Sequence, residues 1–289
     1  MSNPNNPANS IPADKRRLGT AMVLAASLCF STGGLLMKLI PWNPLAINGV
    51  RNAISSVVIG LYILATHHRI KFNPTVLVGA ISMAGVTTLY SIANKLTTAG
   101  NTIILQYTAP IWIVILMYLF FGKKPNRTAL ISILIVFVGI LCFFLEGLSS
   151  GKWLGDLLAL LSGVCYAGVF MMNEGENADA ISSCFIGQLT AGLLFTPLCL
   201  RETDFTAPTL AAVLALGVIQ VGGAYILFSL GIQHTPAVTA SLITGMEPIM
   251  NPLLVAAFYR ETVTPLSVVG SLIVVCSILG YNVWMARRK

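Results

Sequence analysis

The chain alternates between long apolar stretches and short polar breaks, such as those at residues 41–44 and 67–73. Most of the apolar stretches reach the roughly 20 residues that a helix needs to cross a bilayer. The pattern therefore predicts an all-α polytopic membrane protein with ten transmembrane helices. The predicted spans are residues 18–39, 44–66, 74–96, 99–121, 127–146, 153–173, 181–200, 208–231, 236–258 and 263–286.

Composition favours the same class. Hydrophobic residues make up 56% of the 289 positions and charged residues only 9%, whereas a soluble domain carries about a quarter charged residues. So few charges cannot cover a surface that faces water, so most of the surface must face lipid. The six cysteines lie inside apolar stretches without the close pairing of a disulfide framework or a zinc site. We therefore expect no metal site and no cofactor.

The basic residues gather at the ends of the apolar stretches, which is the pattern of membrane topology rather than of nucleic-acid binding. With the N-terminus inside, eleven of the 17 Lys and Arg residues fall on inner segments and five on outer ones. This bias predicts that both termini are cytoplasmic. Residues 1–17 are predicted to form a disordered cytoplasmic tail. The basic end at 287–289 is expected to contact anionic lipid headgroups.

The second half of the chain echoes the first at an offset of 138 residues, and the midspan Pro110 coincides with Pro248. Five spans in each copy is an odd number, so the second copy must enter the membrane upside down. The predicted organisation is two inverted five-helix repeats, at 18–146 and 147–286. Such repeats are typical of secondary transporters. The alternative is a duplication that only enlarged a helical bundle.

Prolines interrupt two of the predicted spans near the middle of the membrane. A proline inside a helix removes one backbone donor and frees the carbonyl four residues earlier. Pro110 frees the carbonyl of Gln106, Pro248 frees that of Thr244, and Pro252 adds a second break nearby. Broken helices at matching positions in two halves point to the binding site of a transporter. Kinking for packing is the alternative.

Polar and aromatic side chains close to these breaks share helical faces. Thr244, Glu247 and Asn251 lie three and four residues apart and therefore form one stripe. Any single hydroxyl or amide could serve only to bond a neighbouring helix, but matched stripes on several spans beside two breaks favour a polar cavity. The candidate substrate-binding residues are Glu247, Gln106, Asn251, Thr244, Tyr225, Ser91, Asn94, Ser229, Tyr107, Trp112 and Tyr90.

Glu247 stands out, because an ionised carboxylate in the middle of a membrane costs at least roughly 2.5 kcal/mol. It could take a proton, bind a cationic group of the substrate or pair with a protein cation, and the first option would couple transport to protons. A structural carboxylate that ties down the broken helix is the alternative. Arg51 is interpreted equally as a clamp on backbone carbonyls or as a gate near the outer face. Lys95 lies about 15 Å from Glu247 along the membrane normal, so both could line a path, but one small amino acid could not bridge them.

The sequence resembles the EamA-type members of the drug/metabolite transporter superfamily. The resemblance covers residues 18–286 and rests on Arg51 and on the stretches LQYTAP at 105–110, EPIMNP at 247–252 and YRETVT at 259–264. It implies a secondary active transporter of small metabolites in the cytoplasmic (inner) membrane of a prokaryote. Amino acids and export are favoured, and organic cations or nucleobases are the alternative cargo.

Other function classes fit the sequence less well. An intramembrane enzyme needs a clustered catalytic set, and no HExxH, GxSxG or carboxylate pair occurs within a span. A channel or helper subunit would not need inverted halves with broken helices, and no P-loop exists for ATP. We therefore expect a carrier, not an enzyme, that moves a zwitterionic or cationic small molecule by alternating access, with the lipid bilayer as its other partner.

Overall fold

A computed structural model gives the fold. It describes residues 13–122, 127–172, 177, 179–231, 234, 243–244, 247, 250, 254–255, 258 and 264–287. Within these ranges the chain is helical and contains no strand. In the first half the helices are α1 (Ala13–Ser31), α2 (Gly33–Leu39), α3 (Pro44–Thr66), α4 (Pro74–Leu96), α5 (Ala99–Gln106), α6 (Ala109–Phe121) and α7 (Arg127–Ser150). In the second half they are α8 (Trp153–Met172), α9 (Ala180–Phe195), η2 (Thr196–Arg201), α10 (Ala207–Ala215), η3 (Leu216–Gly223), α11 (Ala224–Gly231) and α14 (Pro265–Arg287).

Six helical stretches in the described part of the chain are long and apolar enough to cross a membrane. They are Arg17–Leu39, Pro44–Thr66, Pro74–Leu96, Ala99–Leu116, Ala180–Arg201 and Ala207–Gly231. Shorter apolar helices lie at Leu130–Cys142, Trp153–Val169 and Pro265–Tyr281. The chain is therefore an integral membrane protein that crosses the bilayer several times. The ninth predicted span, at 236–258, lies mostly outside the described residues, so ten spans remain a prediction.

Local capping fixes where two of the spans begin. The side chains of Asn43 and Asn73 accept hydrogen bonds from the backbone N–H groups of Leu45 and Val76, both at 2.9 Å. Each asparagine is followed by a proline at the first helical position, where no amide hydrogen is needed. At its other end α3 stops at His67, which adopts a left-handed conformation with φ 52°.

Helix α1 begins at Ala13 and not at the predicted residue 18. Residues 13–17, predicted as the end of a disordered tail, are helical instead, and residues 1–12 lie outside the described ranges. The reason is local. Asp14 lies in the first turn, where its negative charge interacts favourably with the helix dipole and stabilises the helix. The basic residues that follow are good helix formers. A span predicted from apolar residues alone stops at such charges, but the hydrogen-bonded helix continues through them.

Three spans in the described part of the chain are interrupted inside the bundle. The first is interrupted at Thr32, whose hydroxyl donates to the Cys29 carbonyl at 2.7 Å. The fourth leaves α-helical geometry at Tyr107 and Thr108, between α5 and α6 and just before Pro110. The span at 207–231 contains the π-helical segment η3. Only the second of these interruptions has a proline beside it.

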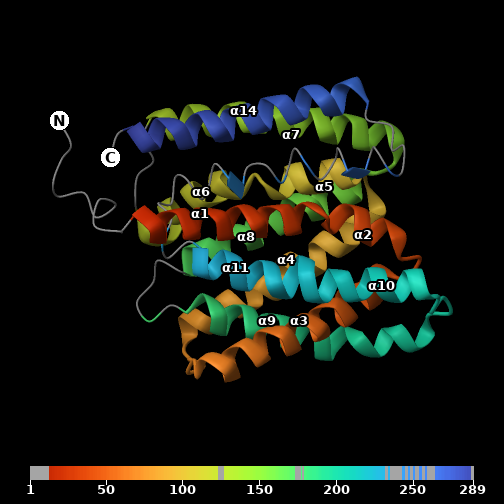
Figure 1. Cartoon of the computed structure of the whole chain (residues 1–289). Coiled ribbons are helices and arrows are strands. Elements are labelled where there is room, and N and C mark those ends of the chain that lie inside the picture. Colours follow the sequence, from red (N-terminus) through yellow and green to blue (C-terminus); the bar gives the residue numbers. More distant parts are fainter. Residues whose placement is uncertain are drawn as a thin grey trace.

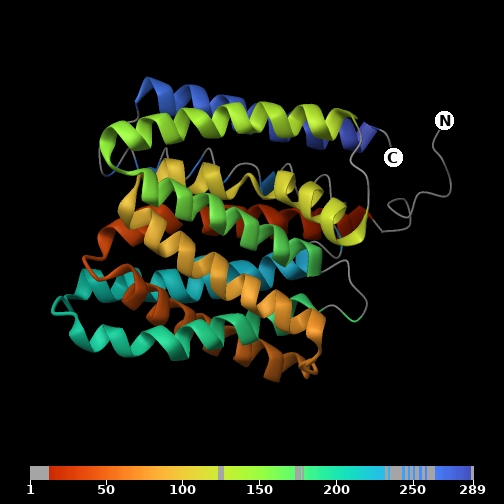
Figure 2. The ribbon, with the colours of Figure 1, turned by 180° about the vertical axis from the view of Figure 1, so that it is seen from behind.

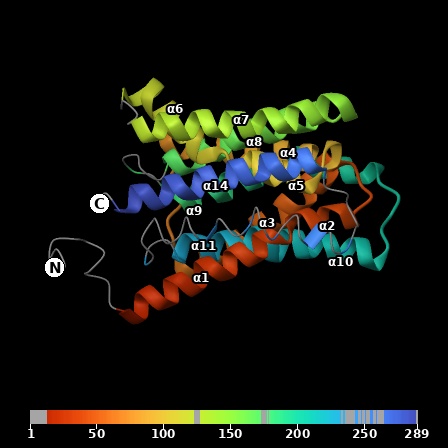
Figure 3. The ribbon, with the colours of Figure 1, turned by 90° about the horizontal axis from the view of Figure 1, so that it is seen from above.

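The helices run along one another and form a bundle several helices thick (Figures 1 and 2). Helices α7 and α14 pack together at one edge, and α3 and α9 pack together at the opposite edge. Helices α4 and α8 pack against each other between these edges. Seen from the α7–α14 edge, α1 runs obliquely to α7 (Figure 3). The middle of the bundle is thus enclosed by helices from both halves of the chain.

Helix α3 turns its polar side chains inward. Asn48 and Asn52 are fully buried, whereas Val57, Leu61 and Leu64 are more than 60% exposed on the outside. This reversal of the soluble pattern is expected where the outer face meets hydrocarbon, because lipid tails are as apolar as leucine. The buried polar face of α3 leads directly to the site described next.

Candidate functional site

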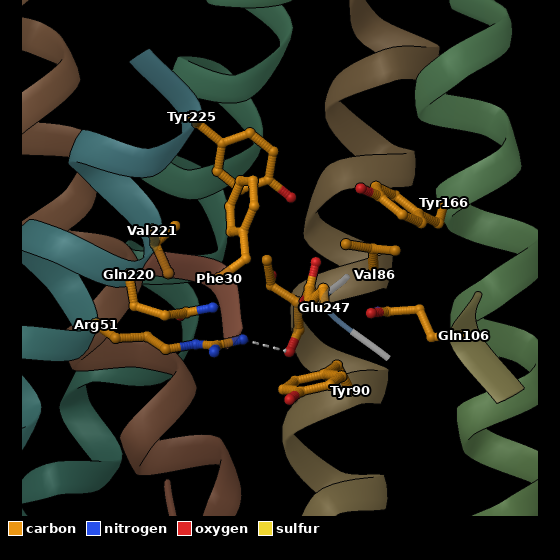
Figure 4. Close-up of a pocket in the computed structure, with 11 residues that line it drawn as sticks. Phe30, Arg51, Val86, Tyr90, Gln106, Tyr166, Gln220, Val221, Tyr225 and Glu247 are labelled. Carbon is orange, nitrogen blue, oxygen red and sulfur yellow. Dashed lines mark hydrogen bonds between the residues drawn. The ribbon is translucent and has the colours of Figure 1, made fainter. Parts of the chain in front are cut away.

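A cavity of about 50 Å³ lies in the middle of the bundle (Figure 4). Seven helical elements line it, namely α1, α3, α4, α5, α8, η3 and α11, together with the helical residue Glu247. The lining residues are Phe30, Arg51, Val86, Thr87, Tyr90, Gln106, Tyr166, Gln220, Val221, Tyr225 and Glu247. The walls therefore combine a guanidinium, a carboxylate, two amides and an aromatic surface.

Arg51 supplies the positive charge. It is 2% exposed, and its Nη2 donates to the Thr87 carbonyl at 2.9 Å (dashed line in Figure 4) and lies 3.4 Å from Asn48 Oδ1. Within the described part of the chain, Nη1 has the sulfur of Met37 at 3.9 Å as its partner, and Nε has no hydrogen-bond partner. The guanidinium lies 5.9 Å from the centre of the Tyr90 ring. Among the described residues no carboxylate forms an ion pair with Arg51. A buried cation in this state is suited to bind an anion.

Glu247 supplies the negative charge. It is 7% exposed, and its Oε2 accepts a hydrogen bond from the hydroxyl of Tyr107 at 2.5 Å. Tyr107 stands at the interruption between α5 and α6 and packs edge-on against Tyr166, with ring centres 6.2 Å apart. The helix interruption in the first half of the chain thus provides the donor that holds the carboxylate of the second half.

Amides and aromatic rings complete the walls. Gln106, the last residue of α5, donates to Ser162 on α8 at 2.9 Å. Phe30 and Tyr225 meet in a T-shaped contact with ring centres 5.0 Å apart, and both project into the cavity (Figure 4). Gln220 enters from η3. An apolar and aromatic wall with a few polar groups is the usual make-up of a small-molecule site.

Several of the predicted site residues meet here. Glu247, Gln106, Tyr225 and Tyr90 line the cavity, and so does Arg51, which was predicted as a clamp or a gate. Arg51 does bond one backbone carbonyl, but it does so from inside the cavity. Arg51 brings helix α3 into the wall of the cavity.

Other predicted residues lie outside the cavity lining. They are Ser91, Asn94, Ser229, Thr244, Tyr107, Trp112 and Lys95. Ser91 donates to the Thr87 carbonyl one turn earlier in α4 at 2.7 Å and to Asn48 Oδ1 on α3 at 3.2 Å, and Trp112 donates to Thr108 four residues earlier at 3.1 Å. Lys95 binds the Ile40 carbonyl at 2.5 Å near the end of α4. The predicted residues Asn251, Pro248 and Pro252 lie outside the described part of the chain.

Six of the lining residues were not among the candidates, namely Phe30, Val86, Thr87, Tyr166, Gln220 and Val221. Gln220 was missed because an α-helical period places Tyr225 and Ser229 on one stripe and leaves Gln220 off it. The π-helical segment η3 has a wider turn, so residues 220 and 225 face the same cavity. Its lone amide in an otherwise apolar span was a signal that could have identified it.

Comparison with known proteins gives one family. The EamA-like transporter family matches the chain over residues 17–145 and 153–283. The uncharacterized transporter YwfM of Bacillus subtilis (strain 168) is 28% identical over 95% of this chain and 97% of its own length. The threonine/homoserine exporter RhtA of Escherichia coli (strain K12) is 22% identical over 72% of this chain and 71% of its own. A solved crystal structure that is 18% identical superposes with a TM-score of 0.66, covering 95% of this chain and 100% of that one, which shows a shared fold.

Proposed function

This chain belongs to the EamA-like transporter family, and we propose that it is a secondary active transporter of small zwitterionic metabolites, with α-amino acids as the substrate class. We propose further that it works by alternating access between two inverted repeats, at 18–146 and 147–286. In this proposal it exports its substrate across the cytoplasmic membrane, and both of its termini are cytoplasmic.

One observation carries the proposal: Arg51 and Glu247 line the same buried cavity without forming an ion pair with each other. Figure 4 shows Arg51 extending toward the space that Glu247 also faces. An amino acid has one anionic and one cationic end, and each would be costly to bury without a partner. A guanidinium suits the carboxylate, and a carboxylate suits the ammonium. The site therefore matches both charges of a zwitterion.

Two further points support amino-acid export. RhtA, whose name describes a threonine/homoserine exporter, is a distant relative. In addition, Arg51 belongs to the first half of the chain and Glu247 to the second, so a bound amino acid bridges the two halves. Movement of one half against the other would separate its two binding partners. This is what alternating access at a central site requires.

Uptake by proteoliposomes that contain the purified chain tests the proposal. L-threonine is compared with 1-aminopropan-2-ol, which has the same skeleton without the carboxylate, in the presence and absence of an imposed pH gradient. We expect uptake of threonine and little uptake of the amine. Arg51→Gln should abolish threonine uptake, whereas Arg201→Gln, which removes an exposed charge outside the cavity lining, should not.

Two results would contradict the proposal. One is equal uptake of the amine and the amino acid by the wild type, which would indicate a carrier of organic cations. The other is threonine uptake by Arg51→Gln at the wild-type rate, which would show that the guanidinium does not bind the substrate.

A further inference from the structure

The π-helical segment η3 (Leu216–Gly223) brings the amide of Gln220 into the cavity that Arg51 lines. We propose that Gln220 is a second hydrogen-bond donor for the carboxylate of the substrate, and that Gly33 is the contact that holds its amide in place. This inference rests on the proposed function, because it assumes that Arg51 receives the carboxylate of a zwitterion.

The backbone of η3 lies unusually close to α3 at the turn that carries Arg51. A Cβ atom at Gly217 would lie 2.5 Å from Ile54 Cβ and 3.1 Å from the Arg51 carbonyl oxygen. Only glycine allows this approach, and three residues later the wide π turn points Gln220 inward. Figure 4 shows Gln220 and Arg51 extending from their helices toward the same space.

The two ends of the Gln220 amide lie in different surroundings. Its Oε1 is buried and has no hydrogen-bond partner in the described structure. Its nitrogen points toward the cavity (Figure 4) and lies 2.9 Å from where a Cβ at Gly33 would stand. Gly33 is the first residue of α2, directly after the interruption of the first span at Thr32. The amide therefore packs closely against Gly33 of span one, with its nitrogen on the side of the cavity.

The charge of the site explains why an amide suits this position. A carboxylate has two oxygens and about four lone-pair positions, more than one guanidinium edge satisfies. A second cation beside Arg51 would repel it in a buried site. An amide adds a donor without adding charge. With Arg51, Glu247 and a zwitterion the occupied site then stays neutral overall.

Binding measurements on the full-length protein in detergent test the role of Gln220. The variant is Gln220→Met, which keeps the length of the side chain and removes the donor. The probes are L-threonine, L-valine and 1-aminopropan-2-ol. A hydrogen bond to a charged group is worth enough that its loss should weaken threonine binding about ten-fold or more. Binding of 1-aminopropan-2-ol should not change, because that probe has no carboxylate.

Gly33→Ala keeps the glutamine and provides an independent test. The added methyl group would lie 2.9 Å from Gln220 Nε2, so the amide must move and threonine binding should weaken while binding of the amine does not. The matched control is Gly280→Ala in α14, where an added Cβ meets nothing within 4 Å. This second variant decides the question if Gln220→Met does not fold.

Three outcomes would overturn the inference. The first is unchanged threonine affinity in both variants while Arg51→Gln weakens threonine binding strongly, which refutes the role of Gln220 and leaves the proposed function intact. The second is an equal loss for threonine and the amine, which shows a merely structural role. The third is a change confined to the ratio of threonine to valine, which assigns Gln220 to the side chain of the substrate. If the wild type binds no amino acid, both the proposed function and this inference are refuted.

Discussion

Replacing Glu247 by glutamine removes one charge from the cavity and leaves its shape almost intact. The hydroxyl of Tyr107, which donates to Glu247 Oε2 at 2.5 Å, can also donate to the carbonyl oxygen of a glutamine, although more weakly. The variant should therefore fold and keep the interruption between α5 and α6 in place. What it loses is the charge that meets the ammonium of the substrate and the ability to carry a proton.

The size of the effect on binding follows from the kind of hydrogen bond that is lost. Hydrogen bonds to charged groups contribute about 1.5–3 kcal/mol and neutral ones about 0.5–1.5 kcal/mol. The difference of about 1–2 kcal/mol corresponds to roughly 5- to 30-fold weaker binding of the amino acid. Since Glu247 is only 7% exposed, water can screen little of this loss, so the upper part of the range is expected.

Transport measurements separate the roles that Glu247 could have. Purified Glu247→Gln is reconstituted, and accumulation driven by a pH gradient is compared with exchange of substrate across the membrane. If Glu247 carries the proton, accumulation vanishes while exchange persists. If it binds only the ammonium, the affinity falls and the residual transport keeps its pH dependence.

Glu202→Gln is the control for loss of a carboxylate. Glu202 accepts a hydrogen bond from the backbone of Asn43 at 2.9 Å at the end of the bundle and does not line the cavity. Wild-type accumulation and wild-type exchange in Glu247→Gln would refute any functional role of this carboxylate. The proposed zwitterion site would then lack a partner for the ammonium group of the substrate.

Three further predictions concern the guanidinium of Arg51, the buried carboxylate of Asp156 and the membrane topology. Arg51→Lys keeps the charge but loses the planar fork that suits a carboxylate, so threonine affinity measured by calorimetry should fall about ten-fold; an unchanged affinity would show that charge alone suffices. Asp156→Ala removes the buried acceptor of Thr97 Oγ1 at 2.7 Å and Asn101 Nδ2 at 3.3 Å, so the free energy of unfolding in detergent should drop by about 2–4 kcal/mol, and an unchanged melting temperature would contradict this. A single cysteine at position 289, in a cysteine-free background, should react only with reagents that enter the cytoplasm, and labelling from outside would overturn the predicted topology.

Span boundaries were predictable where a cap fixes them. The predicted spans at 44–66 and 74–96 match α3 and α4 to the residue, because an asparagine cap followed by proline marks each start in the sequence. Helices α1 and α7 run past the predicted apolar stretch. Helix α7 continues to Ser150 although its predicted span ended at residue 146, since polar residues end a hydropathy pattern without ending backbone hydrogen bonding.

The cavity could be predicted only in part. Gln106 and Glu247 were found because they lie beside proline breaks, which the sequence displays. Arg51 was interpreted equally as a clamp on carbonyls or as a gate near the outer face, because nothing in the sequence of α3 reveals its packing against η3. That packing depends on the missing side chain at Gly217, a tertiary contact between distant parts of the chain. Gln220 was missed because a π-helical turn changes the helical phase.

Each charged residue of the cavity has a cavity neighbour or bonding partner from the other half of the chain. Tyr107 of the first half bonds Glu247 of the second, and Gln220 of the second half enters the cavity that Arg51 of the first half lines. Under the proposed two-repeat organisation, movement of one half against the other would disturb both ends of the site together. An amino acid that loses one end would then be released instead of remaining bound by the other.

Because both halves of the chain contribute to one site, we predict that Arg51 and Glu247 act as a unit in binding. Once either charge is removed, the zwitterion must bury one end without a partner, so it no longer seats fully and the second residue has little left to contribute. The double variant Arg51→Gln/Glu247→Gln should therefore bind L-threonine only slightly more weakly than the weaker single variant. Calorimetric titration of the wild type, both single variants and the double variant measures this coupling. Fully additive losses would show that the two charges act independently, and the single bridging ligand proposed for this cavity would have to be abandoned.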